Sequence, residues 1–295
     1  MAEEKTEKRS LLHKAQSVLA DVTPTFTNWA KRSGFVRAAI LSPCSTSDGD
    51  FYIATDSFGL TARDMALLTE TKEFWDETLS KAFEWQCFSR DFNELEKFDG
   101  IFEDEIYNNI NKLFFLPFRD KKIPLIFVLI ELDDDDDITL KEASQVAVML
   151  KNIVEFKNQE EKILSKLNAN TEKGLEISAA RLYLLSLKSC IDNELEGIEL
   201  PGDELKTKVC QSITETAQIT VAPLFRAPNC SFAGTNGEIK VVLFAKEDED
   251  EELLAYHVAR TLISLLGSRA TKEIQLLSAG LCPNQKGAVA FLCQG

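Results

Sequence analysis

Acidic side chains form two uninterrupted runs, and carboxylates are the groups that could hold a divalent cation. Asp133 to Asp137 are five consecutive aspartates, and Glu247 to Glu252 are six consecutive acids. Neither run has the spacing and the glycine of a calcium loop, and adjacent carboxylates cannot all point at one ion. Each run falls between a predicted strand and a predicted helix, where carboxylates stabilise the positive end of the helix dipole. We interpret both runs as solvated helix starts and predict no metal site.

Sulfur and imidazole groups are too scattered to predict a metal or haem site. The chain has seven cysteines, two histidines (His13 and His257) and no CxxC pair. This pattern favours small buried thiols in a reducing compartment. The sequence also shows no Ser/His/Asp arrangement, no Cys/His pair, no Walker-type phosphate loop and no HExxH motif. We therefore predict no catalytic residue and no cofactor.

Charge and length restrict the classes of partner. The chain has 295 residues, 48 acids and 33 basic residues, which gives a net charge of −15. Such a charge repels phosphates, so we expect binding to neither nucleic acid nor anionic lipid. The longest apolar run, Pro124 to Leu132, is far shorter than the roughly 20 residues that span a bilayer, and Met1 to Arg9 has no signal core. We expect a cytoplasmic protein of two domains.

The first half predicts a sheet with helices on it. We expect one helix at each of Ser10–Lys31, Thr69–Ala82 and Glu103–Lys112, and strands at Phe35–Leu41, Phe51–Thr55, Phe83–Phe88, Leu113–Phe118 and Pro124–Ile130. Ser47–Asp50 predicts the turn of a hairpin. Apolar side chains on both faces of the last two strands are typical of central strands. Tyr52, Trp85, Cys87 and Phe118 are the candidate lining residues of a pocket, and the alternative is that they are core.

This order of elements resembles that of a GAF domain. The residues on which the resemblance rests are Phe58–Gly59–Leu60, Leu116–Pro117–Phe118 and the closing strand that ends at Glu131. The resemblance covers about residues 10–132. It implies a module that senses a small molecule or dimerises, with a pocket between the sheet and the helices over it. No cysteine is followed by the histidine expected for bilin attachment, and no cyclic-nucleotide signature is present.

A long helix is predicted from Thr139 to Leu167. Thr139 and Glu142 form a capping-box pattern at its start. Apolar residues then recur at alternating steps of three and four, interrupted by Glu160: Val146, Met149, Ile153, Phe156, Ile163 and Leu167. Such a heptad stripe, roughly 45 Å long at about 1.5 Å per residue, predicts a coiled-coil connector and a homodimer. The alternative is that the stripe packs on its own domain.

The second half predicts the order strand, helix, hairpin, helix, strand. The expected strands are Arg181–Leu187, Thr220–Phe225, Glu238–Phe244 and Ile274–Gly280, and the expected helices are Asp203–Ala217 and Asp250–Leu266. The segment through Asp192 to Gly202 is expected to be a loop. His257 is predicted to be a packed core residue on the apolar face of its helix, with Leu253.

Three segments of this half resemble a GGDEF (diguanylate cyclase) domain: Cys190–Ile191–Asp192–Asn193, the hairpin loop Gly234–Thr235–Asn236–Gly237–Glu238, and Leu277–Ser278–Ala279–Gly280. The resemblance implies a nucleotidyl-cyclase-like sheet with its signature loop in the hairpin. Ser186 and Lys188 stand where the family has metal-binding aspartates, and a lysine is incompatible with a cation site. Arg226 precedes the loop near the place of an inhibitory dinucleotide site, with Asn229 in place of its aspartate. We therefore expect a degenerate, inactive domain.

Together these patterns predict an α/β protein of the α+β type, with a GAF-like domain at 1–137, a linker helix at 138–174 and a degenerate GGDEF-like domain at 175–295. The expected function is a non-catalytic signalling or regulatory protein with a possible signalling protein partner. Two alternatives are a receptor that binds a nucleotide or metabolite in the GAF-like pocket and, with least support, an active cyclase.

Overall fold

A computed structural model describes residues 26, 30, 33–81, 83–119, 124–132, 180–225, 230–243 and 251–282. Helices and antiparallel sheets occur together, as the predicted α+β class requires. The chain divides into two compact units. The first is Met1–Ser45, Gly49–Phe58 and Leu68–Lys173, and the second is Thr46–Asp48, Gly59–Leu67 and Gly174–Gly295. The predicted helix at 139–167, the aspartate run at 133–137 and the segment 226–229 lie outside the described residues.

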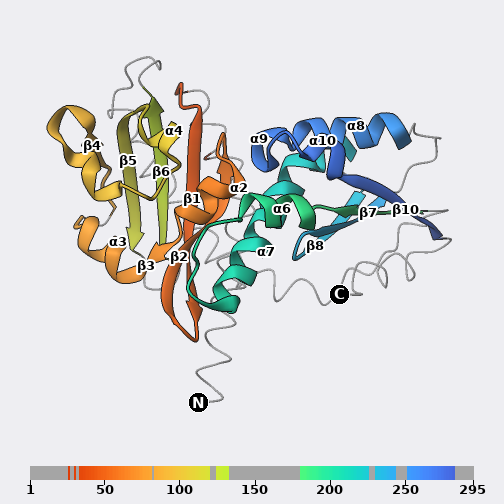
Figure 1. Cartoon of the computed structure of the whole chain (residues 1–295), viewed down its shortest axis with the longest axis horizontal. Helices are drawn as coiled ribbons and strands as arrows, with labels where there is room; N and C mark the ends of the chain where they lie inside the picture. The colour runs from red at the N-terminus through yellow and green to blue at the C-terminus, as the bar shows by residue number, and fades with distance from the viewer. Residues whose placement is uncertain are drawn as a thin grey trace, which may run out of the picture. The chain divides into compact units, whose positions relative to one another are not determined.

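The first unit contains a six-stranded sheet in the order β3-β2-β1-β6-β5-β4 (Figure 1). Its strands are β1 (Arg37–Thr46), β2 (Gly49–Phe58), β3 (Glu70–Thr71), β4 (Gln86–Ser89), β5 (Ile110–Arg119) and β6 (Pro124–Leu132). Strands β5 and β6 lie inside the sheet, as their continuous apolar sequence predicts. The predicted hairpin near Ser47 is confirmed, because a two-residue turn joins β1 to β2.

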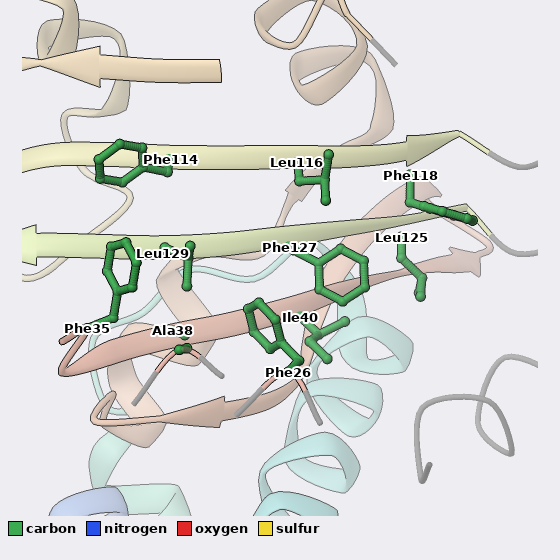
Figure 2. Packing of buried hydrophobic residues seen from close by; sticks show 11 residues of the cluster. Phe26, Phe35, Ala38, Ile40, Phe114, Leu116, Phe118, Leu125, Phe127 and Leu129 are labelled. Atoms are coloured by element: carbon green, nitrogen blue, oxygen red, sulfur yellow. The ribbon is translucent and has the colours of Figure 1, made fainter. Parts of the chain in front are cut away.

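One face of this sheet carries a core that we call the first-sheet core (Figure 2). Its members are Phe26, Ala30, Phe35, Ala38, Ile40, Phe114, Leu116, Phe118, Leu125, Phe127 and Leu129. The core members in β1 and β5 have even residue numbers and those in β6 have odd ones, because successive side chains of a strand point to opposite faces of the sheet. The rings of Phe26 and Phe127 lie 5.0 Å apart, so the helical residue Phe26 packs directly on the central strand.

The opposite face is covered by short helices. Trp75 of α3 (Lys72–Thr78) lies 5.4 Å from Phe115, and Phe98 of η2 (Glu94–Phe98) stacks on Phe115 at 5.1 Å. Both Trp75 and Phe98 are buried. Between η2 and β4 lies η1 (Arg90–Phe92). Aromatic rings thus pack between the sheet and the helices over it.

Two predictions for the first half of the chain need correction. The helix expected over Glu103–Lys112 is only one turn long, α4 (Asp104–Tyr107), because Ile110 already pairs with Leu132 in the sheet. The prediction also missed α2 (Ala62–Leu67), which belongs to the second unit. Its start is a capping box: the Asp64 carboxylate accepts from the Thr61 amide, and the Asp64 amide donates to the Thr61 hydroxyl.

The second unit has a four-stranded antiparallel sheet in the order β10-β7-β9-β8. Its strands are β7 (Ala180–Ser186), β8 (Cys230–Thr235), β9 (Glu238–Leu243) and β10 (Gln275–Cys282). Its further helices are α6 (Lys188–Glu194), α7 (Gly202–Val221), η3 (Ala222–Phe225), α8 (Glu251–Thr261), α9 (Ile263–Leu266) and α10 (Ala270–Glu273). The order β-α-β-β-α-β is that of a split βαβ fold.

The strand expected over Thr220–Phe225 is wrong. Its residues complete α7 and form η3, and the first hairpin strand is β8 instead. The β-branched tract misled the prediction because its apolar spacing is helical: Ala217, Val221 and Phe225 are all buried at steps of four. The expected loop through Asp192 is also wrong, since it contains α6.

Candidate functional site

The hairpin between β8 and β9 turns at Asn236 and Gly237, within the predicted signature loop Gly234–Thr235–Asn236–Gly237–Glu238. Thr235 pairs with Glu238, and Gly234 pairs with Ile239. Asn236 and Gly237 have φ angles of +44° and +88°. Two successive residues with positive φ make a tight two-residue turn, and Asn-Gly is the sequence that adopts it most readily. The predicted turn is therefore confirmed.

Both backbone donors of this turn are bound by side chains of α7. The Asn236 amide donates to Gln211 Oε1 at 2.9 Å, and the Gly237 amide donates to Thr214 Oγ1 at 2.7 Å. The Thr214 hydroxyl in turn donates to the Cys210 carbonyl at 2.8 Å. Because Thr214 and Gly237 are buried, the bond between them replaces water for an amide that would otherwise be unsatisfied, whereas Asn236 is exposed.

The same turn lies against the start of α6. The Leu187 amide donates to the Gly237 carbonyl at 2.6 Å. A side chain at Gly237 would place its Cβ 2.8 Å from the Cα of Lys188, which is closer than two carbons can approach. The turn is thus bonded on one side to α7 and closed on the other by the backbone between β7 and α6.

Ser186 and Lys188, where the GGDEF resemblance requires metal-binding carboxylates, end β7 and begin α6 respectively. The Lys188 side chain is exposed. Ser186 pairs with Glu238 on one side and with Gln275 on the other. Among the described residues, no group of three or more His, Cys, Asp or Glu side chains could hold a metal ion.

A carboxylate next to this region binds side chains of α6. Glu273 Oε2 accepts from the Ser189 hydroxyl at 2.9 Å, from Asn193 Nδ2 at 3.2 Å and from the Cys190 thiol at 3.8 Å. Burial raises the pKa of Cys190 to about 11, and the charge of Glu273 adds to this effect. A thiol with so high a pKa is a poor nucleophile at neutral pH. The cluster fixes α10 (Ala270–Glu273) to α6 and offers no activated group.

The four candidate pocket residues of the first unit do not share a face. Trp85 and Cys87 are half-buried against the first-sheet core, which contains Phe118. Tyr52 is buried but does not belong to that core. On the same strand the Thr55 hydroxyl bonds to the Ser42 hydroxyl, whose even position in β1 places it on the core face. Successive residues of a strand point to opposite faces, so Tyr52, three residues before Thr55, points away from the core. The structure therefore does not bring Tyr52 together with the other three.

The sequence interpretation missed a polar cluster at one end of the first-sheet core. Glu131 is fully buried, and its Oε1 accepts from Lys112 Nζ at 3.1 Å and from Asn111 Nδ2 at 3.0 Å. Its Oε2 is buried without a hydrogen-bond partner. Burial raises the pKa of the nearby Cys87 to about 11; the charge of Lys112 lowers it, and the charges of Glu131 and Glu94 raise it. The sequence signal that could have predicted this cluster was the single acid, Glu131, near the end of a very apolar strand.

His257 is exposed, so the prediction of a core histidine is wrong. Leu254, Val258, Leu262 and Leu265 form the buried face of α8 and α9. Leu253 and His257 lie one residue before members of this face, which turns them about 100° away from it. The error arose because apolar residues of this helix occur on its exposed side as well as on its buried side, so the sequence pattern did not identify the buried face.

No family model matches the chain, and neither curated proteins nor solved structures give a match. Within the described ranges, no helix combines the length and the apolar character that crossing a membrane requires.

Gly237→Ala tests the closure of the hairpin turn. We expect it to lower the free energy of unfolding by about 2–5 kcal/mol, because the positive φ and the clash with Lys188 both disfavour a Cβ. Gly197→Ala is the matched control. Gly197 also has a positive φ of +79° but no atom within 4 Å of an added Cβ, so we expect a loss of about 1 kcal/mol. Urea unfolding measures both, and equal losses would contradict the closure.

Cys87 tests the electrostatics of the polar cluster. Its folded pKa of about 11 exceeds the ordinary value of 9.0, so the protonated thiol is favoured by folding. This stabilisation is complete below pH 9 and is lost as the pH rises toward 11. At pH 8 the folded chain has about 100-fold less thiolate at Cys87 than the unfolded chain. We expect iodoacetamide to modify it correspondingly slowly, as peptide mass spectrometry measures.

Two substitutions separate charge from loosened packing at Cys87. Glu131→Gln removes a negative charge and should lower the thiol pKa and accelerate alkylation, whereas Lys112→Met removes a positive charge and should slow it. Acceleration by both substitutions would show that loosening, rather than charge, controls the thiol.

Proposed function

We propose that this chain is a non-catalytic signalling or regulatory protein, in which a GAF-like module is coupled to a degenerate GGDEF-like module. The order of elements supports the proposal in both units. In the first, β1 and β2 are followed by helices, then by β4 and the β5–β6 hairpin. In the second, a strand, helices, a hairpin, helices and a strand follow one another. These are the orders on which the two resemblances rest.

The observation that carries the proposal is the closed hairpin turn. Phosphoryl transfer by two metal ions needs carboxylates to hold the cations and free donors to hold the phosphates. At this turn the Asn236 and Gly237 amides are already bound by Gln211 and Thr214. The neighbouring Lys188 brings a positive charge to a place where the chemistry needs a negative one. The arrangement suits a structural turn in an interaction domain.

The predicted helix at Thr139–Leu167 would give this protein its coupling element. Its heptad stripe would pair two copies, and a change in the first module would alter the register or the pairing of the helix. The net charge of −15 disfavours binding to nucleic acid and to anionic membranes. The proposed location is the cytoplasm.

Incubation with nucleotides tests the absence of cyclase activity. We expect no cyclic mononucleotide or dinucleotide from GTP or ATP with Mg²⁺ or Mn²⁺, because the carboxylates that would hold the metals are replaced by Ser186 and Lys188. Chromatography of the reaction mixture gives the answer. A product that disappears in Gly237→Ala or in a variant of Glu238 would contradict the proposal.

Sedimentation tests the coupling helix. We expect the full chain to be a dimer at tens of micromolar, and Met149→Glu combined with Phe156→Glu to make it monomeric by placing charges in the seam. Lys151→Glu with Lys157→Glu, which lie outside the stripe, is the control and should leave the dimer intact. A monomeric wild-type chain would show that the stripe does not pair two copies.

A further inference from the structure

Helices α8 and α9 carry apolar side chains on their outward face as well as on their buried face. The Leu262 amide donates to the Val258 carbonyl and the Leu266 amide to the Leu262 carbonyl, so the two helices are nearly continuous (Figure 1, blue). Facing outward are Leu253, Tyr256 and Ile263, which are 53%, 54% and 37% exposed, together with the exposed His257 and Arg260. We call these five residues the outer seam.

The spacing of the outer seam distinguishes it from ordinary scattered exposure. Single exposed apolar residues are common on protein surfaces and need no explanation. Here Leu253, Tyr256, Arg260 and Ile263 follow one another at steps of three and four, which is the spacing of a helix-packing seam. They extend over about 15 Å of helix. The outer seam lies on the side of the helix opposite its buried face.

Tyr256 is already held in place within the seam. Its hydroxyl accepts from Arg260 Nη1 at 3.2 Å, and its ring meets the His257 ring edge-on at 5.7 Å. Tyrosine and arginine are the residues that most often supply the binding energy of protein interfaces. A preorganised pair of this kind loses little side-chain entropy when a partner covers it.

The charge distribution favours a second copy of the chain as the partner. Two chains that each carry a net charge of −15 repel one another over most of their surfaces. Residues 253–272 contain no acid, although the chain has 48 of them. Arg260 is the one fully charged residue of the seam, so two seams can approach without opposing carboxylates.

We propose that the outer seam pairs with the same seam of a second copy, antiparallel, about a two-fold axis near Val258. In this arrangement Leu253 meets Ile263 of the partner subunit, and Tyr256 meets Arg260 of the partner subunit. The contact is isologous and self-complementary, since each apolar end meets an apolar end and each guanidinium meets an aromatic ring.

The seam is too short to hold two copies together by itself. About three turns of helix bury less than the roughly 1,200 Å² that stable interfaces need. The inference therefore rests on the proposed function, because the dimer formed by the helix at 139–167 supplies the first contact. Once two chains are joined, the second contact forms at an effective concentration in the millimolar range.

Disulfide trapping tests the pairing. His257→Cys places a thiol next to the proposed axis, and we expect the full chain with this substitution to form an intermolecular disulfide on mild oxidation at least ten times faster than Thr207→Cys. Thr207 is an exposed residue of α7 outside the seam, and its variant reports random collision. The unchanged chain gives the background of the native cysteines. Equal rates for the two variants would overturn the pairing.

A charge introduced into the seam provides an independent test of the pairing. Ile263→Asp in the His257→Cys chain should reduce the rate of disulfide formation at least tenfold. Ile219→Asp, at an α7 residue that is 45% exposed, should leave the rate unchanged. If Ile263→Asp has no effect, the seam does not pair.

Sedimentation of the same samples separates this inference from the proposed function. A dimer in which His257→Cys is no faster than Thr207→Cys overturns the seam and leaves the helix dimer standing. A monomeric chain contradicts the helix dimer. The rates of disulfide formation of His257→Cys and Thr207→Cys are then compared at millimolar protein. A rate at least ten times faster for His257→Cys supports pairing of the seam, and equal rates overturn it.

Discussion

The second unit depends on the satisfaction of one buried backbone group. The amide of Gly237 cannot reach water, and the hydroxyl of Thr214 binds it at 2.7 Å while donating to its own helix. This bond joins the hairpin to α7, and the Leu187 amide joins the same turn to the β7–α6 connection. Glycine is favoured there, because its φ is +88° and an added Cβ would lie only 2.8 Å from the Cα of Lys188. The geometry that closes the turn also removes the donors that a phosphate would need.

The first unit is organised by its two central strands. β5 and β6 present aromatic and aliphatic side chains to both faces, with the first-sheet core on one face and Trp75, Phe98 and Phe115 on the other. Glu131 of β6 is polar and fully buried, and its charge is balanced by Lys112 of β5. A buried ion pair contributes little net stability but is costly to break. Burial raises the pKa of the neighbouring Cys87 thiol to about 11, so this thiol is a poor nucleophile at neutral pH.

Strong periodicity predicted most of the elements, and local ambiguity explains the errors. The β1–β2 hairpin, the central strands and the helix that contains Leu205, Val209 and Ile213 were predictable, because burial on a defined face sets their pattern. The structure of Thr220–Phe225 was not predictable, because β-branched residues are typical of strands but here they extend a buried helix. The turn at Asn236–Gly237 could be predicted from its sequence, but its bonds to Gln211 and Thr214 could not. Those residues are distant in the chain, and only the fold brings them together.

Hydrogen exchange at the hairpin turn tests the central claim most directly. The account predicts that the amides of Asn236 and Gly237 exchange slowly, and that GTP with Mg²⁺ leaves their rates unchanged, because both donors are bound within the protein. Rapid exchange of these amides in the free chain, or protection that appears only with GTP and Mg²⁺, would show an open nucleotide site and contradict the account.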